Sequence, residues 1–184
     1  MTHVDRTLSR DCAATLIPAG SPFTLPKGTH VMLTHNLGGN YTVTCDYGMF
    51  RIDGRDADAL GEAKQTIQPV AGAAGTVLGL PEESLFWDKL RTVYDPEIPV
   101  NIVDLGLVYS LDVMESEDKK GCLVHVYMTL TAPGCGMGPV IAEDARCRLV
   151  EVPGVTDAVV EIVWDPPWDQ SRMSEPARLE LGFF

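Results

Sequence analysis

The charge of this chain changes abruptly near residue 80. The first 80 residues carry 6 basic and 7 acidic side chains, a net charge of −1, whereas residues 81–184 carry 8 and 19, a net charge of −11. The change falls in VAGAAGTVLGLPEES, whose run of small residues ends at Pro81. Segments of this composition are typical of boundaries between domains. The sequence therefore predicts two domains, residues 1–80 and residues 81–184.

Charge and hydropathy exclude several classes of protein. The chain has 184 residues, and 45% of them are hydrophobic, which is enough to bury a substantial core. Its net charge of −12 argues against general binding to nucleic acid or to anionic membranes, because like charges repel. No run of about 18 apolar residues occurs, and Asp or Arg interrupts the apolar stretches of residues 1–16. We therefore expect a cytoplasmic protein without nucleic-acid or membrane partners.

The five cysteines form no recognisable metal or disulfide pattern. Their number is odd and no two are spaced as C-x-x-C, so at least one is expected to be a free thiol. Cys45, Cys122 and Cys147 fall in predicted strands or a helix, where thiols usually pack and react slowly. Cys12 is expected in a loose terminus, with ordinary thiol reactivity.

Residues 1–80 are predicted to be rich in β-strands. The runs Val31–Leu33, Tyr41–Asp46 and Met49–Asp53 favour strands, and the turn sequence NLGGN separates the first two. The stretch Ala57–Thr76, rich in Ala and Gly, is left unassigned. This part is predicted to form a small β-rich domain.

Residues 81–184 alternate helices and strands. Pro81 and two glutamates open a predicted helix, which should end before Asp95 because a residue that precedes proline avoids the α region. The remaining predicted elements are strands Leu105–Val113 and Cys122–Leu130, a helix after Gly138, a strand Val155–Trp164 and a helix Ser174–Leu181. This order predicts an α+β sandwich.

The predicted strand Cys122–Leu130 has a strict alternation of residue types. Val124, Val126, Met128 and Leu130 form one face, opposite Leu123, His125, Tyr127 and Thr129. The second set is therefore expected on the other face of the sheet.

Two carboxylates and two prolines occur together in Asp95-Pro96-Glu97-Ile98-Pro99, and Asn101 and Asp104 follow. The prolines make this backbone rigid. Acids at a helix C-terminus are unfavourable for the helix dipole, so a functional role is one interpretation. A solvated turn in which Asp95 ends the helix is the alternative, and the pattern does not decide between them.

A glycine-rich segment, TAPGCGMGP (residues 131–139), joins a predicted strand to a predicted helix. Cys135 lies near the start of that helix, where backbone N–H groups and the dipole favour a thiolate. The flanking glycines let another molecule approach closely. A reactive or metal-ligating cysteine is therefore favoured over a small residue tolerated in a tight turn.

A third segment, WDPPW (residues 164–168), places two prolines between tryptophans. Such a stiff, extended loop could cover a site or contact a partner. Both indoles could equally be hydrophobic plugs, and the sequence does not separate these readings.

Four ordered motifs resemble the iron–sulfur assembly domain family, which includes accessory proteins of the bacterial SUF system. They are DPEIPVNIVDLGLVYSLDV, VYMTLTAPGCG, EVPGVTDAVVEIVWDPPW and MSEPARLELG, within residues 82–182. The resemblance implies an iron–sulfur assembly domain in which Cys135 is the reactive cysteine and shares a pocket with Asp95, Glu97 and Thr131. Ala132 stands where many family members have a second threonine, so support of the thiolate from that position is in doubt.

The resemblance further implies a maturation factor without enzymatic turnover. Its implied partners are the SUF machinery and client apoproteins. A single thiolate does not hold a cluster stably, because clusters normally take four ligands. Shared across a homo-oligomer or with a client's cysteines, Cys135 could bind iron or a cluster transiently, with no resident cofactor.

Two alternatives from other classes stay open. One is a thiol transferase or hydrolase with Cys135 as nucleophile and Asp95 or Glu97 as base. It has less support because His125, the only histidine of the second part, falls within a predicted strand. The other is a pure adaptor that binds partners through WDPPW and its acidic surface.

Overall fold

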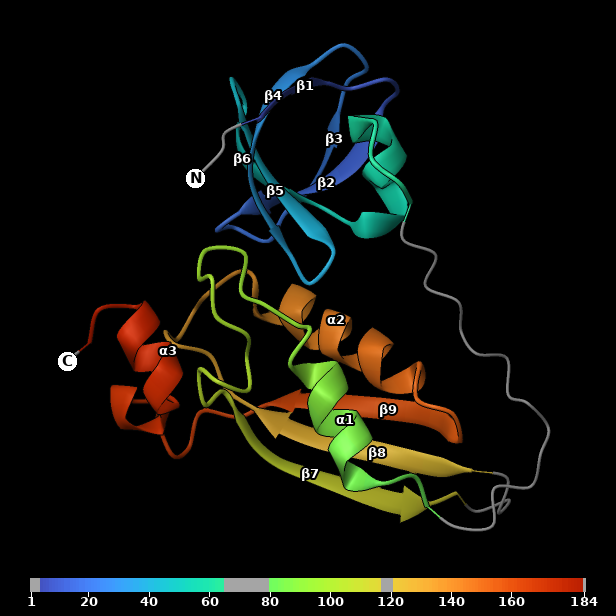
Figure 1. Ribbon diagram of the computed structural model, residues 1–184, viewed down its shortest axis with the longest axis vertical. Helices are drawn as coiled ribbons and strands as arrows, with labels where there is room; N and C mark the ends of the chain where they lie inside the picture. The colour runs from blue at the N-terminus through green and yellow to red at the C-terminus, as the bar shows by residue number, and fades with distance from the viewer. Residues whose placement is uncertain (1–3, 65–79, 117–120, 184) are drawn as a thin grey trace. The chain divides into compact units, whose positions relative to one another are not determined.

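The computed structural model describes residues 4–64, 80–116 and 121–183. The chain divides into two compact units, one built on a six-stranded sheet and one on a three-stranded sheet (Figure 1). The predicted boundary near residue 80 adjoins residues 65–79, which lie outside the described residues, so the domain limits 1–80 and 81–184 stay a prediction. Within the described ranges, no helix combines the length and the apolar character needed to span a membrane.

The first unit is an antiparallel sheet, which confirms the predicted β-rich region. Its strands are β1 (Val4–Thr7), β2 (Cys12–Ile17), β3 (Pro22–Leu25), β4 (His30–Leu37), β5 (Asn40–Cys45) and β6 (Gly48–Ile52). They are hydrogen-bonded in the order β1-β4-β5-β6-β2-β3. Gly38 and Gly39, both with positive φ, make the predicted turn between β4 and β5. A 3-10 helix, η1 (Gly54–Leu60), follows β6.

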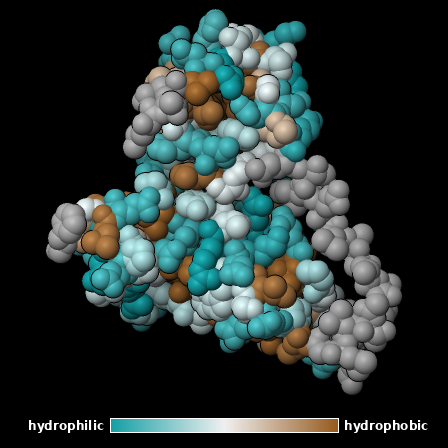
Figure 2. Space-filling model, in the orientation of Figure 1, coloured by the Kyte–Doolittle hydropathy of each residue, from teal (hydrophilic) through white to brown (hydrophobic). Residues whose placement is uncertain are grey.

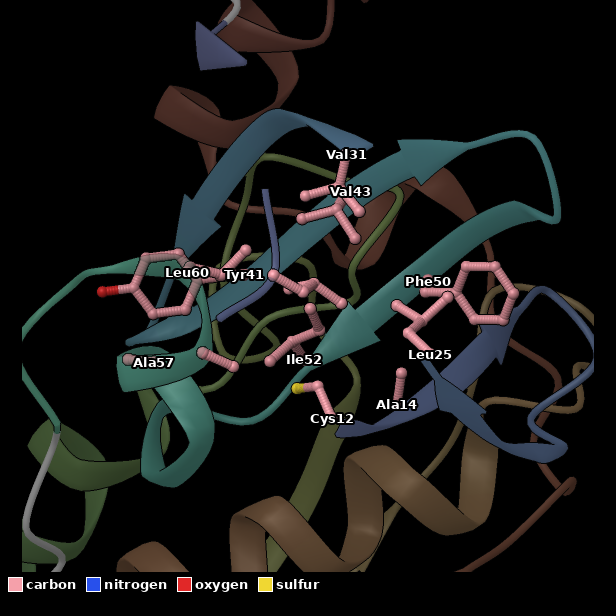
Figure 3. Packing of buried hydrophobic residues seen from close by; sticks show 12 residues of the cluster. Cys12, Ala14, Leu25, Val31, Tyr41, Val43, Phe50, Ile52, Ala57 and Leu60 are labelled. Carbon is pink, nitrogen blue, oxygen red and sulfur yellow. The ribbon is translucent and has the colours of Figure 1, made fainter. Parts of the chain in front are cut away.

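The hydrophobic core of the first unit is enclosed by the sheet and η1. Figure 3 shows side chains of both turned toward this interior. Cys12, Val43 and Ile52 have no exposed surface there. The expectation that Cys12 lies in a loose terminus is wrong, because Cys12 is the first residue of β2. Burial raises the pKa of its thiol to about 11, which disfavours the reactive thiolate.

The second unit has a mixed sheet with helices, which confirms the predicted α+β class. Its elements are α1 (Glu83–Leu90), β7 (Val108–Glu115), β8 (Cys122–Met128), α2 (Gly138–Val150), β9 (Val155–Ile162), a 3-10 turn η2 (Gln170–Arg172) and α3 (Glu175–Glu180). The sheet order is β7-β8-β9. β7 and β8 pair antiparallel, whereas β8 and β9 pair parallel and are connected through α2.

The two faces of this sheet differ in burial. Along β8, Val124 and Val126 are fully buried, and His125 and Tyr127 between and after them are only half-buried. Helix α2 contacts β9 and also contacts α1, whose inner residues Phe86 and Leu90 are fully buried. The helices therefore cover one face of the sheet. On the side of the molecule in Figure 2, hydrophilic residues predominate and hydrophobic residues form small separate patches.

Several predicted strand boundaries of the second unit move, whereas helix α1 ends at Leu90, before Asp95, as predicted. Strand β7 begins at Val108 instead of Leu105. Gly106 has a φ of +70°, a left-handed conformation that a regular strand does not adopt, which explains the later start. Strand β8 ends at Met128, two residues early. The alternation therefore stops there, and Thr129 is fully buried, contrary to its predicted place on the other face.

The WDPPW segment packs against the loop that precedes β7. The indole Nε1 of Trp168 donates to the carbonyl of Leu105 at 2.8 Å, and the hydroxyl of Tyr109 donates to the carbonyl of Pro166 at 2.8 Å. Trp164 is 47% exposed. The half-buried Trp168 thus has a structural role through its hydrogen bond to Leu105, while the indole of Trp164 is exposed.

Candidate functional site

Cys135 lies in the connection from β8 to α2. Since β8 and β9 are parallel and α2 joins them, this connection is at the carboxyl ends of the two strands. In open sheets with parallel strands, ligands bind at this edge. Cys135 stands three residues before Gly138, the first residue of α2, and its side chain is partly exposed. The predicted strand–loop–helix setting of Cys135 is therefore present.

The start of α2 packs closely on the end of β8. A side chain at Gly138 would place its Cβ 2.6 Å from Cδ1 of Leu130 and 3.2 Å from Cδ1 of Ile162. A larger residue here would make the Leu130 side chain shift, so glycine lets the first turn of α2 approach this closely. The free N–H groups of that turn follow directly after the Cys135 segment.

Asp95 is buried in the turn that follows α1. The residue is 5% exposed, and its Oδ1 accepts a hydrogen bond from the backbone N–H of Glu97 at 2.9 Å. The backbone N–H of Ile98 donates to the carbonyl of Asp95 at 3.1 Å. Burial raises the pKa of the Asp95 carboxyl, and the hydrogen bond from Glu97 partly opposes this. Glu97 itself is exposed. The interpretation of Asp95 as a simple solvated turn residue is thus wrong in one respect, because its side chain is not solvated.

Asn101 and Asp104 have structural roles in the same loop. The Oδ1 of Asn101 accepts from the backbone N–H groups of Val103 and Asp104, at 3.1 and 2.9 Å. Its Nδ2 donates to Oδ2 of Asp104 at 2.6 Å. The backbone carbonyl of Asp104 accepts from the N–H of Ser174 at 2.8 Å. These contacts fix the path of the loop between Asp95 and β7.

A ladder of backbone hydrogen bonds connects the Asp95 loop to the end of β8. The N–H of Ile102 donates to Val93, the N–H of Leu107 donates to Ile102, and the N–H of Thr129 donates to Leu107, at 2.9, 2.9 and 2.8 Å. Asp95 lies two residues after one end of this ladder, and Thr131 lies two residues after the other. Thr131 is half-buried and begins the segment that leads to Cys135. The pocket of Asp95, Glu97, Thr131 and Cys135 stays a prediction.

Thr129 is a buried polar residue that sequence reasoning missed. Its side chain has no exposed surface, and no described residue hydrogen-bonds its Oγ1. An unpaired buried hydroxyl costs about 1–3 kcal/mol, which makes it unusual at a strand end. The alternating pattern gave no signal for it, because Thr129 continues that pattern in sequence while the strand ends one residue earlier.

The two cysteines of the second unit, Cys122 and Cys147, are less suited to chemistry than Cys135. Cys122 is fully buried, and burial raises the pKa of its thiol. Cys147 lies on α2, where burial and then the carboxylate of Glu143 raise the pKa of its thiol. Among residues 4–64, 80–116 and 121–183, no three His, Cys, Asp or Glu side chains cluster as metal ligands.

Residues 87–162 match the family described as "Iron-sulfur cluster assembly protein". A Porphyromonas gingivalis protein named "Fe-S protein maturation auxiliary factor" is 49% identical over 94 residues, which are 51% of this chain and 85% of that protein. The chain belongs to this family. Identity at this level over most of a relative's length confirms the resemblance that the four motifs indicate.

Two further matches have similar extent. A Staphylococcus aureus protein named "Fe-S protein maturation auxiliary factor SufT" is 46% identical over 90 residues, 49% of this chain and 97% of that protein. A solved structure, "Crystal Structure of Domain of Unknown Function DUF59 from Bacillus anthracis", has 40% identity and a TM-score of 0.47, and covers 55% of this chain and 92% of that one. About half of this chain thus lies outside each match. Asp95, Glu97, Thr131 and Cys135 all lie inside the family region, residues 87–162.

Proposed function

We propose that this protein is an accessory maturation factor for iron–sulfur proteins that delivers iron or a cluster through the thiolate of Cys135. The observation that carries the proposal is the position of Cys135 within the family region, at the carboxyl ends of two parallel strands and just before α2. The relatives named maturation auxiliary factors support the same role.

The chemistry is a ligand exchange that needs no oxidant or reductant. The thiolate of Cys135 binds a ferrous iron, alone or within a small cluster whose other ligands are sulfide and a partner's thiolates. A client cysteine loses its proton and binds the same iron, and the bond from iron to the Cys135 sulfur breaks. The proton returns to the Cys135 thiolate. One protein thiolate is a labile anchor, because stable clusters take four, and lability suits transfer.

The two alternatives find less support in the second unit. A cysteine hydrolase needs a base oriented toward the nucleophile. Asp95 is buried and its Oδ1 accepts from the backbone of Glu97, while His125 lies in β8 beside Glu161 on the neighbouring strand. For the pure adaptor, Trp168 of WDPPW already binds the loop before β7, and Pro166 already accepts from Tyr109 of β7.

Transfer to a client tests the proposal directly. Wild type, Cys135→Ser and Cys147→Ser are loaded anaerobically with ferrous iron and sulfide, passed through a desalting column and mixed with apo-aconitase. We expect wild type and Cys147→Ser to restore aconitase activity and Cys135→Ser to fail, because a serine hydroxyl ligates soft iron poorly. Equal restoration by Cys135→Ser would reject the cysteine mechanism. Turnover of a small thioester or disulfide substrate by wild type would favour the enzyme instead.

A further inference from the structure

The outer face of the β7–β8–β9 sheet, opposite the helices, is not covered by α1 or α2. The register places three residues of each strand on it, and we call these nine residues the open sheet face: Ser110, Asp112, Met114, Leu123, His125, Tyr127, Asp157, Val159 and Glu161. On the central strand β8 this face carries an aliphatic, an imidazole and a phenol side chain and no carboxylate, Lys or Arg.

An apolar strip crosses the open sheet face from Met114 through Leu123 to Val159, and the imidazole of His125 lies within it. Met114 pairs with Leu123, and Val159 pairs with His125, across neighbouring strands. Met114 and Val159 are 45% and 42% exposed. The ring of His125 stacks on Tyr127 at a centroid distance of 4.4 Å. An apolar strip that crosses three strands differs from the isolated exposed side chains of an ordinary surface.

Acidic side chains border this strip on both edge strands. Asp112 on β7 is exposed, and Glu161 on β9 has a side chain that is 56% exposed. Asp157 also lies on β9, but its Oδ1 is 3.7 Å from Nη1 of Arg146, which offsets its charge. None of the nine residues is Lys or Arg. The borders of the face are therefore negative, and its middle is apolar.

His125 lies at the centre of the face. Its Nε2 is shielded from solvent and lies 3.4 Å from Oε2 of Glu161. The side chain as a whole is 23% exposed, so a partner would contact other atoms of the ring.

We infer that the open sheet face binds an amphipathic helix of a partner protein, with basic side chains along both borders of its apolar stripe. Helices already cover the inner face of the same sheet, and helix-on-sheet packing is the usual way to bury such a surface. Basic side chains would face Asp112 and Glu161, and the apolar stripe would cover Met114, Val159 and Tyr127. A second copy of this chain fits poorly, since it would set acidic borders against acidic borders.

The inference deepens the proposed function, because a maturation factor must bind the proteins that it serves. The direct test needs no natural partner. The 15N-labelled full chain is titrated with a synthetic amphipathic helix that has Leu on one face and Lys along both borders, and with a matched peptide that has Glu in place of Lys. We expect the Lys peptide to shift the amide resonances of β8 and of Val159, and the Glu peptide to leave them unchanged.

Two sets of variants make the test specific. Val159→Lys should weaken binding of the Lys peptide by about tenfold or more, because it places a cation in the apolar strip. Leu85→Lys is the matched control and should leave binding unchanged. Leu85 lies on α1 and is 45% exposed. Asp112→Asn combined with Glu161→Gln should weaken binding and reduce its dependence on salt. The inference would be overturned if the Lys peptide did not bind, or if both peptides bound equally. It would also be overturned if Val159→Lys bound the Lys peptide as tightly as wild type does.

A cellular arm separates this inference from the proposed function. Val159→Lys and Leu85→Lys are expressed in a strain that lacks the protein, and aconitase activity is measured. If wild type and Leu85→Lys rescue and Val159→Lys does not, the face is needed for maturation. If all three rescue equally, the face is not a docking site for a client or carrier. If wild type does not rescue, the proposed function fails, while the peptide titration still decides whether the face binds a basic helix.

Discussion

The backbone N–H of Thr129 donates to the carbonyl of Leu107 at 2.8 Å. This bond joins the end of β8 to the loop that carries Asp95, although the two segments are far apart in sequence. Both segments also contain the residues that the family resemblance assigns to one pocket. A substitution in the Asp95 segment is therefore expected to change the reactivity of Cys135.

Removing the Asp95 charge should increase the rate at which Cys135 is alkylated. A carboxylate near a thiol disfavours the thiolate, so Asp95→Asn should accelerate the reaction, and Glu97→Gln should do so to a smaller extent because Glu97 is exposed. Rates of iodoacetamide labelling at Cys135 would be followed by mass spectrometry from pH 6 to 8. Glu180→Gln, on α3, is the control. If neither Asp95→Asn nor Glu97→Gln changes the labelling rate, the acids do not lie near Cys135 and the shared pocket is rejected.

Cys135 should react faster than Cys12, Cys122 and Cys147 in the folded protein. Cys135 should be labelled first, because it is partly exposed in a loop before a helix. Cys12 and Cys122 have no exposed surface, and burial raises the pKa of both thiols, that of Cys12 to about 11. Cys147 is partly exposed, but burial and Glu143 raise the pKa of its thiol, so it should also be slow. Peptide mapping after a short pulse of reagent measures this order. Labelling of Cys147 before Cys135 would contradict it.

Asp95→Asn should stabilise the protein most at neutral and alkaline pH. Burial raises the pKa of the Asp95 carboxyl in the folded state, so the folded protein binds this proton more tightly than the unfolded chain does. That contribution to stability is fully present below the unfolded pKa and is lost as pH rises through the folded pKa. Asparagine has no such loss, and its Oδ1 can still accept from Glu97. Urea midpoints of both proteins at several pH values would test this. A stability difference that is constant with pH would show that Asp95 is not a strained buried carboxyl.

Gly106→Ala should destabilise the fold by about 2–4 kcal/mol, as the sum of a left-handed backbone and a steric clash. Gly106 has a φ of +70°, and a Cβ there would lie 2.2 Å from the backbone carbonyl oxygen of Arg172. Gly182 also has a positive φ, +79°, but a Cβ there would meet no atom within 4 Å. Gly182→Ala should therefore cost only about 1–2 kcal/mol. Thermal and urea denaturation of the two variants compares them. Equal losses would mean that the C-terminal segment does not pack tightly on Gly106.

The fold of the second unit could be predicted because its elements follow clear periodicities. Alternation along β8, the acids at the start of α1 and the Ser174 cap of α3 all act within a few residues of sequence. The first unit gave weaker signals. Strand β2 begins with Cys12-Ala13-Ala14, which has little strand preference, and β3 has only four residues, starting at Pro22. Their pairing in one sheet depends on contacts distant in sequence.

The candidate site was predicted in part, for a related reason. The loop setting of Cys135 follows from local sequence, since glycines and prolines separate a strand from a helix. The burial of Asp95 and of Thr129 depends on where the chain returns much later, so no local pattern reveals it. Pro96 and Pro99 explain why the Asp95 turn is rigid, but not that its carboxyl is removed from water. The likeness of the four motifs to a known family supplied what periodicity could not.

Rescue of iron–sulfur enzymes in cells tests the central claim most directly. A strain that lacks this protein is complemented with wild type, Cys135→Ser or Cys147→Ser at equal expression, and aconitase activity is measured under iron limitation. We expect wild type and Cys147→Ser to restore the activity and Cys135→Ser to leave it at the level of the deletion strain. Rescue by Cys135→Ser equal to that of wild type would contradict the thiolate mechanism and favour a role as an adaptor alone.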